Sequence, residues 1–206
     1  MGELVHLLRE PAAAPDGALI LNHGRATNER DLYPLLEELD PERRLLGVTT
    51  GAPLTNVPPG GRRWYLVPRV GYPDPETFAS SYGLLTGLCD ALLEEHGIGW
   101  ERTVLGGFSM GAVMSYAVGL GPGRPSPAAI LAFSGFVPTV DGWDPELGGR
   151  GRLPVLIHHG RADRSSRSSS AAPPKSCSPP RGSRSNTSRP TPRTRCRASP
   201  SSAQSS

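Results

Sequence analysis

Five short apolar runs, separated by polar and helix-forming stretches, constrain the fold of this chain more than any other feature. They cover residues 18–21, 45–49, 103–105, 129–133 and 154–157. Such uniformly apolar runs are typical of strands that are buried on both faces of a sheet. Their alternation with helical patterns indicates βαβ units with parallel strands. We therefore predict an α/β fold built on a largely parallel central sheet.

Two amphipathic helices are predicted between these runs. The first carries leucines at positions 32, 35, 36 and 39. The second covers about residues 76–96, and its apolar residues recur every three or four positions at Phe78, Tyr82, Leu85, Cys89 and Leu92. Pro75 before this helix and Gly97 after it fit the usual residue preferences at helix ends.

The composition changes sharply after Asp163. Residues 164–206 hold 9 of the 22 Lys and Arg and none of the 19 Asp and Glu, so this tail carries +9. Residues 1–163, with 13 basic and 19 acidic side chains, carry −6. The tail has 15 serines and 7 prolines but no Val, Ile, Leu, Met, Phe, Tyr or Trp. Because it offers no large apolar side chain to bury, we expect 164–206 to be disordered and 1–163 to be the folded body.

Several protein classes are disfavoured by the sequence. No stretch approaches the roughly 20 apolar residues of a membrane span, and acidic residues stand where a signal peptide needs a basic start. Three cysteines without paired spacing argue against a disulfide framework or a zinc site, and we expect Cys89 to be a small apolar helix residue. We expect a cytoplasmic protein without stable membrane insertion.

The loop after the third apolar run contains the pattern G-x-S-x-G, centred on Ser109. The pattern alone is weak, since this chain is rich in glycine. Here it lies between a predicted strand and the helical stretch 112–120, which is the strand–turn–helix context of a serine nucleophile. Gly107 and Gly111 allow a sharp turn in which the backbone of Ser109 is strained. The alternative is a glycine-rich turn with an incidental serine.

Two further loops follow predicted strands, where function gathers in parallel sheets. The loop after the first run, 22–25, is placed to aim the Arg25 amide at the same point as the Met110 amide, which would form an oxyanion hole. We interpret His23 as a packed loop residue. After the fifth run comes Asp163, placed to orient a catalytic histidine unless it is a plain surface aspartate.

These motifs together resemble the phospholipase/carboxylesterase family of the α/β-hydrolase superfamily, small serine esterases related to acyl-protein thioesterases. The resemblance rests on 21–24, 107–111, 134–136 and 159–163. It implies a three-layer sandwich of the α/β-hydrolase type, here without its final strand and helix. It also implies that Ser109 is the nucleophile, Asp163 the triad acid, and the Arg25 and Met110 amides the oxyanion hole. Trp64, Tyr65 and Phe136 resemble cleft-lining positions, with a core role equally open for each. The family needs neither metal nor organic cofactor.

The triad histidine is where the sequence departs from the family. Family members carry this base after the acid in sequence, whereas His159 is the last histidine in this sequence. Without a base, Ser109 would be a weak nucleophile. His158 and His159 precede the acid, and we do not expect either to substitute.

The tail composition offers an explanation for the missing base. When a reading frame shifts by one base, codons for Phe, Leu, Ile and Val can be read as serine codons. Codons for small residues can likewise be read as arginine codons. A histidine codon can then arise across Arg193 and Thr194. We hypothesise that 164–206 is a frameshifted C-terminus, which the nucleotide sequence would decide.

The sequence thus predicts a serine carboxylesterase that hydrolyses small acyl esters or thioesters through an acyl-enzyme on Ser109. The alternative is an impaired α/β-hydrolase remnant that binds ligands but lacks the triad histidine. A third reading makes the basic tail a nucleic-acid or membrane-surface arm, but no aromatic residues are interleaved to stack on bases, so we expect no nucleic-acid partner. Whether the chain forms a homodimer stays open.

Overall fold

The computed structural model describes residues 4–57, 61–69 and 71–160. Residues 161–206, Asp163 among them, lie outside this range. The elements are β1 (His6–Arg9), β2 (Gly17–Asn22), α1 (Tyr33–Leu39), β3 (Leu45–Thr50), β4 (Leu54–Val57), β5 (Gly61–Arg63), α2 (Pro75–Glu95), the 3₁₀ helix η1 (Trp100–Arg102), β6 (Thr103–Phe108), α3 (Met110–Leu120), β7 (Ala129–Phe133) and β8 (Val155–His158).

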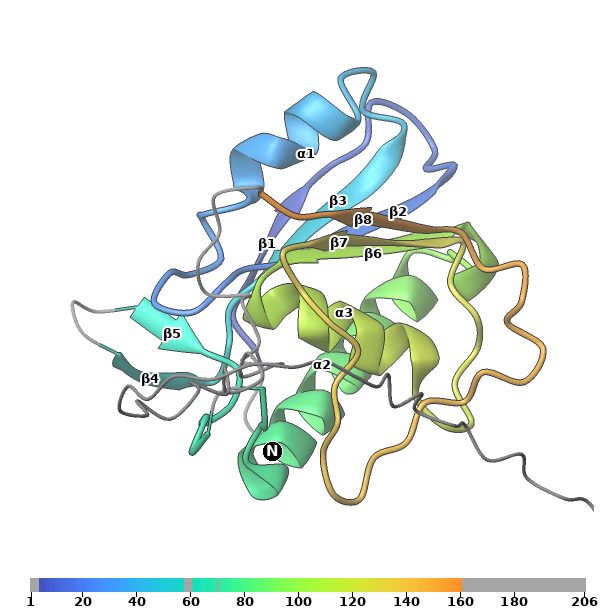
Figure 1. Cartoon of the computed structure of the whole chain (residues 1–206). Coiled ribbons are helices and arrows are strands. Elements are labelled where there is room, and N and C mark those ends of the chain that lie inside the picture. Colours follow the sequence, from blue (N-terminus) through green and yellow to red (C-terminus); the bar gives the residue numbers. More distant parts are fainter. Residues whose placement is uncertain (1–3, 58–60, 70, 161–206) are drawn as a thin grey trace, which may run out of the picture. The chain divides into compact units, whose positions relative to one another are not determined.

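Six strands form one sheet in the order β1-β3-β2-β6-β7-β8 (Figure 1). β1 is antiparallel to β3, and every other neighbouring pair is parallel. The chain adds β3 on one side of β2 and later returns to place β6 on the other side. Because the strand order reverses between β2 and β6, the loops that follow these two strands meet at one point of the carboxyl edge.

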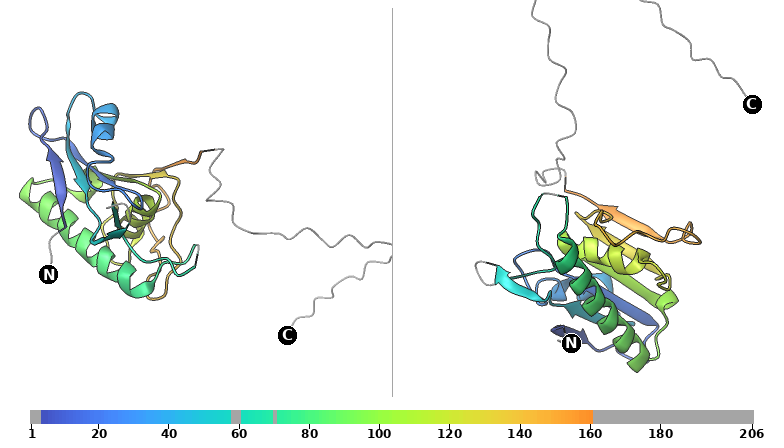
Figure 2. Two further views of the ribbon diagram at one scale, coloured as in Figure 1. Left: turned by 90° about the vertical axis from the view of Figure 1, so that its left-hand side faces the viewer. Right: turned by 90° about the horizontal axis from the view of Figure 1, so that it is seen from below.

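Helices cover both faces of this sheet. α1 contacts β2 and β3 on one face, whereas α3 packs on β2, β6 and β7 on the other, with α2 against α3 (Figures 1 and 2). The larger apolar core lies between the sheet and α2 and α3, and a smaller cluster of Leu19, Leu21 and Leu36 lies under α1. The expected three-layer arrangement of the α/β-hydrolase type is confirmed.

The long helix α2 begins and ends as its sequence predicts. The Asp74 carboxylate accepts hydrogen bonds from the Thr77 backbone N–H at 2.9 Å and the Thr77 hydroxyl at 2.6 Å, which caps the helix N-terminus. Pro75 opens the helix. Gly97 follows its end with φ +62°, a left-handed conformation that favours glycine. Cys89 on this helix is completely buried, and burial raises the pKa of its thiol to about 12.

The sequence pattern did not predict three strands. β1 is a short edge strand, and β4 and β5 pair with each other outside the main sheet with an irregular register. The expectation of burial was wrong for β8. Its residues Val155, Leu156 and Ile157 are 40%, 54% and 62% exposed. β8 is the last strand of the sheet in the described part of the chain, so its apolar run lies at an edge where no described element covers it.

No helix within the described residues has the length and apolar character that a membrane crossing requires.

Candidate active site

Ser109 occupies a sharp turn between β6 and α3. Its backbone has φ +52° and ψ −115°, so the strain expected at this residue is confirmed. Such a conformation costs about 1–3 kcal/mol in a residue with a side chain. The Ser109 N–H donates to the Phe133 carbonyl at 2.8 Å, and the Ser109 carbonyl accepts from the Val113 N–H at 3.1 Å. These hydrogen bonds hold the turn between β7 and the first turn of α3.

The two glycines of the motif let three chain segments approach closely. A Cβ atom added to Gly111 would lie 1.9 Å from the Asn22 carbonyl oxygen, and one added to Gly107 would lie 2.5 Å from the Gly111 carbonyl carbon. Both are backbone contacts that no side-chain rotation relieves. The glycines therefore let α3 start directly against the end of β2.

A buried polar network fixes α3 to the sheet behind the turn. The Asn22 Nδ2 donates to Ser115 Oγ at 2.9 Å, and the Thr50 hydroxyl donates to Asn22 Oδ1 at 2.5 Å. Ser115 Oγ lies 2.8 Å from the Gly106 carbonyl, to which it donates. Every residue of α3 is buried, so this network sets the position of a central helix. It thereby sets the position of Ser109 at the N-terminus of the helix.

His23 is a packed loop residue, as the sequence predicted. The Ala52 N–H donates to its Nε2 at 3.0 Å, and its Nδ1 lies 2.5 Å from the Gly24 carbonyl. Since Nε2 accepts, Nδ1 carries the proton and donates to that carbonyl. Burial lowers the pKa of His23 below its ordinary value. Both ring nitrogens are engaged, so His23 stiffens the loop and leaves no atom free to act as a base.

The backbone amides of Arg25 and Met110 follow adjacent parallel strands. β2 pairs with β6 with Asn22 opposite Gly107, so both amides lie beyond the same carboxyl edge. Met110 is the first residue of α3, where the N–H groups have no partner within the helix. In the described part of the chain neither amide donates a hydrogen bond. This arrangement suits an oxyanion hole, with the positive end of the helix dipole behind it.

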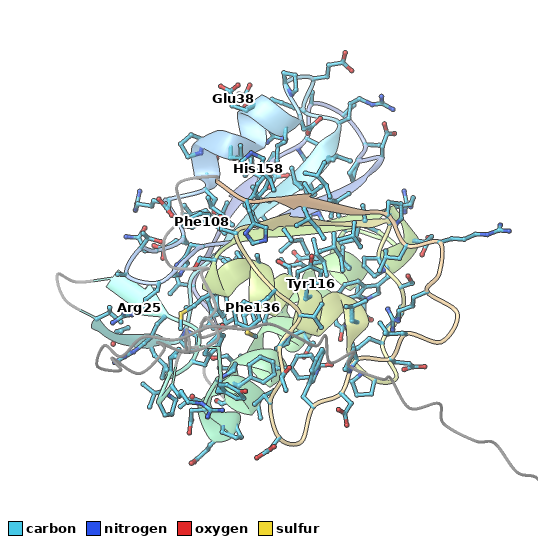
Figure 3. All side chains as sticks on the ribbon, in the orientation of Figure 1. Arg25, Glu38, Phe108, Tyr116, Phe136 and His158 are labelled. Carbon is cyan, nitrogen blue, oxygen red and sulfur yellow. The ribbon has the colours of Figure 1, made fainter. Side chains whose placement is uncertain are left out.

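A cavity of about 370 Å³ opens over Ser109. Its described walls include four of the residues that the sequence singled out, namely Arg25, Met110, Tyr65 and Phe136. Figure 3 shows Arg25 and Phe136, which come from the loops after β2 and β7. Phe136 is 46% exposed, whereas Tyr65 is buried, and burial raises the pKa of its hydroxyl.

Trp64 does not line this cavity, so the first of its two expected roles, cleft lining or core packing, is corrected. The side chain is completely buried, and its indole Nε1 donates to the His23 carbonyl at 2.8 Å. Its ring centroid lies 5.6 Å from that of His23. Trp64 therefore packs against His23 and stabilises the loop that contains Arg25.

Sequence reasoning missed six other wall residues. They are Arg63, Val67, Gly71, Tyr72, Pro73 and Val113. Val113 could have been found, because it lies one helical turn after Ser109 and so faces the same way as the start of α3. The others belong to β5 and the irregular segment after it, where no periodic pattern indicates which residues turn toward Ser109.

None of the five histidines of the chain forms a hydrogen bond with Ser109 among the described residues. His23 follows β2, the direct neighbour of β6, and is engaged as described above, whereas His158 lies further along the sheet, since Phe108, Phe133 and His158 are register partners across β6, β7 and β8. This places its backbone two strand spacings, roughly 10 Å, from that of Phe108. Its ring lies against Phe133, with centroids 6.3 Å apart, at the sheet end that also carries Phe108 (Figure 3). Asp163 lies outside the described residues.

Within residues 4–57, 61–69 and 71–160 no group of three or more His, Cys, Asp and Glu side chains is arranged to hold a metal ion.

Comparison with known proteins places these features in one family. The model of the phospholipase/carboxylesterase family matches residues 9–172. Among solved structures, the carboxylesterase of Mesorhizobium loti aligns with a TM-score of 0.64 at 19% identity, covering 79% of this chain and 74% of that one. The Bacillus cereus carboxylesterase aligns with a TM-score of 0.62 at 18% identity, covering 76% and 84%. A phospholipase/carboxylesterase from Dyadobacter fermentans aligns with a TM-score of 0.53 at 16% identity, covering 78% and 90%. Curated protein sequences give no match. At such identities the structural neighbours establish the fold.

Proposed function

The chain belongs to the phospholipase/carboxylesterase family of ester hydrolases, and from that premise we propose that it is a serine carboxylesterase with Ser109 as its nucleophile. The substrates are small carboxylic esters or thioesters. The observation that carries this proposal is the strained Ser109 turn in the wall of a cavity of about 370 Å³. Beside it lie the Arg25 and Met110 amides, neither of which donates a hydrogen bond to another described residue.

In the proposed reaction, Ser109 Oγ attacks the acyl carbonyl carbon while a general base takes the hydroxyl proton and later passes it to the leaving alcohol or thiol. The Arg25 and Met110 amides donate to the carbonyl oxygen that becomes negative. Loss of one such donor typically lowers kcat by about 10²–10³-fold. Collapse of the tetrahedral intermediate expels the alcohol or thiol and leaves an acyl-Ser109 ester. Water then attacks this ester and releases the acid. Asp163 is proposed as the residue that orients the general base.

The identity of the base separates this proposal from a second candidate, a remnant that binds ligands without turnover. Two observations favour the remnant. Both ring nitrogens of His23 are hydrogen-bonded within its own loop and to Ala52, and the sequence contains no histidine after His159. A serine hydroxyl without a base is barely ionised at neutral pH. We also propose that 164–206 is a frameshifted sequence. Restoring one base near codon 164 must then open an apolar frame containing a histidine.

Hydrolysis of a 4-nitrophenyl acyl ester tests the proposal. We expect the full chain to release 4-nitrophenol faster than Ser109→Ala, and the matched control Ser126→Ala, which changes an exposed serine, to keep the parent rate. Imidazole supplied in solution should raise the rate of the full chain more than that of Ser109→Ala, because it stands in for the missing base. Equal rates for the full chain and Ser109→Ala, with and without imidazole, would support the remnant instead. A frame-restored form should be faster than either.

We further propose that the protein acts in the cytoplasm. Fractionation of cells that express it, followed by detection in the soluble cytoplasmic fraction, would test this.

A further inference from the structure

The peptide group that carries the Arg25 amide is held at its carbonyl end. The Gly24 carbonyl accepts hydrogen bonds from His23 Nδ1 at 2.5 Å and from the Thr27 hydroxyl at 3.3 Å. A trans peptide group is planar, so its N–H points opposite to its C=O. Because the Gly24 carbonyl and the Arg25 N–H belong to one peptide group, these two donors set the direction of that N–H. They turn it away from His23 and Thr27.

We propose that Thr27 is a positioning residue that aims the Arg25 amide into the oxyanion hole, and that Arg62 of β5 holds Thr27 in place. Neither residue belongs to the described walls of the cavity over Ser109, so both act through the Arg25 peptide group and not on the substrate. This inference rests on the proposed esterase function and names residues that the proposed oxyanion hole depends on.

The backbone of β5 pairs with the loop directly after Arg25. Thr27 and Arg62 form an isolated antiparallel bridge, in which the Arg62 N–H donates to the Thr27 carbonyl at 2.7 Å. The Ala26 N–H donates to the Arg62 carbonyl at 2.8 Å, and Ala26 has φ +67°, a left-handed conformation that alanine rarely adopts. A Cβ atom added to Gly61 would lie 2.2 Å from the Ala26 carbonyl oxygen. The bridge therefore stabilises a loop conformation that Ala26 does not favour by itself.

The side chain of Arg62 anchors this bridge to the rest of the site. Its Nη1 donates to the Ala52 carbonyl at 3.1 Å, and its Nε lies 3.6 Å from Glu29 Oε2. That carboxylate oxygen is buried and accepts no hydrogen bond from a described residue, so Arg62 supplies its charge partner. The Ala52 N–H in turn donates to His23 Nε2 at 3.0 Å. Ala52 thus connects Arg62 with His23, one of the two donors to the Gly24 carbonyl.

Thr27→Val removes the hydroxyl donor with little change in side-chain shape. The Gly24 carbonyl then keeps one donor, and its peptide group is free to rotate. We expect kcat to fall about tenfold, less than the effect of losing an oxyanion donor altogether. KM should stay within about twofold, because the amide meets its negative partner only in the transition state. Thr27→Ser keeps the donor and should retain most of the parent kcat. Thr139→Val is the matched control, since Thr139 is exposed and outside the cavity wall.

The assay is hydrolysis of 4-nitrophenyl butyrate by the full chain at one fixed imidazole concentration, with kcat and KM measured separately. Arg62→Gln leaves the Glu29 carboxylate without its charge partner and should lower kcat with the same small change in KM. Arg62→Lys keeps the charge and should retain part of the rate. Arg44→Gln is the control for this pair, because it removes an arginine from the exposed ion pair with Asp16.

Hydrogen exchange measured by mass spectrometry examines the loop without relying on turnover. We compare peptides that cover residues 22–30 and 103–115 in the full chain and in its variants. Thr27→Val and Arg62→Gln should speed exchange in 22–30 about tenfold, because the loop opens more often, and leave 103–115 unchanged. A general loss of stability would speed exchange in both peptides.

A kcat of Thr27→Val within about twofold of the parent value, or a Thr27→Ser variant as slow as Thr27→Val, would overturn the inference. Faster exchange in both peptides would overturn it as well. If the parent hydrolyses the ester no faster than Ser109→Ala, the esterase proposal fails, and exchange alone decides the role of Thr27. Unchanged exchange in 22–30 then overturns the inference, whereas faster exchange confined to 22–30 supports it.

Discussion

Replacing Gly111 by alanine tests the packing that places Ser109. The added Cβ would lie 1.9 Å from the Asn22 carbonyl oxygen and 2.5 Å from the His23 carbonyl oxygen. Ordinary contacts begin near 3.5 Å, so α3 and the end of β2 would have to separate by roughly 1.5 Å. Both are backbone segments in the buried core, and the Asn22–Ser115 hydrogen bond joins them.

We expect Gly111→Ala to lower the free energy of unfolding by about 3 kcal/mol or more, at the upper end for an overpacked core. Gly87→Ala is the matched control. Gly87 lies on the exposed side of α2, where an added Cβ meets nothing within 4 Å. There alanine should stabilise the protein by about 0.5–1 kcal/mol, because glycine is a poor helix former.

Urea unfolding followed by far-UV circular dichroism measures both changes. The two variants should move the midpoint in opposite directions. If Gly111→Ala and Gly87→Ala unfold within about 0.5 kcal/mol of each other, the close approach of α3 and β2 is not what requires the glycine.

Three further predictions concern pH and the sheet edge. Hydrogen bonds from Thr77 lower the pKa of Asp74 below its ordinary 3.8, so the ionised carboxylate stabilises the fold above that pH. Asp74→Ala should therefore lower Tm at pH 7, and the difference in Tm between variant and parent should fade as the pH falls below 4. Burial lowers the pKa of His23 below its ordinary 6.5, so protonation of His23 favours the unfolded chain. Tm should therefore fall as the pH drops below 6.5, and His23→Gln should make this fall less steep. An unchanged dependence of Tm on pH in the variant would contradict this role of His23. Ile157→Lys on exposed β8 should reduce concentration-dependent light scattering while changing the free energy of unfolding by less than about 0.5 kcal/mol, and equal scattering would argue against an adhesive edge.

The sequence predicted those parts of the structure that depend on local pattern. The apolar runs located five strands of the main sheet, and the glycines at 107 and 111 located the strained turn at Ser109. Features that depend on distant partners were missed. The exposure of β8 could not be predicted, because an apolar run does not reveal whether another element covers it.

The wall of the cavity shows the same limit at the level of single residues. Trp64 and Tyr65 are neighbours in sequence, yet only Tyr65 lines the cavity while Trp64 packs under His23. Arg63, directly before them, carried no signal of its own. The irregular segment after β5, through its packing on α2, decides which of these side chains turns toward Ser109. The sequence of that segment has no periodic pattern from which its packing could be predicted.

Covalent labelling of Ser109 tests the central proposal most directly. The full chain is incubated with a fluorophosphonate, with imidazole present to supply a base, and the labelled peptide is identified by mass spectrometry. The proposed mechanism predicts one label on Ser109 that is absent from Ser109→Ala and unchanged in Ser126→Ala. A label on another residue, or labelling of Ser109 no faster than that of the exposed Ser126, would contradict the assignment of Ser109 as an activated nucleophile.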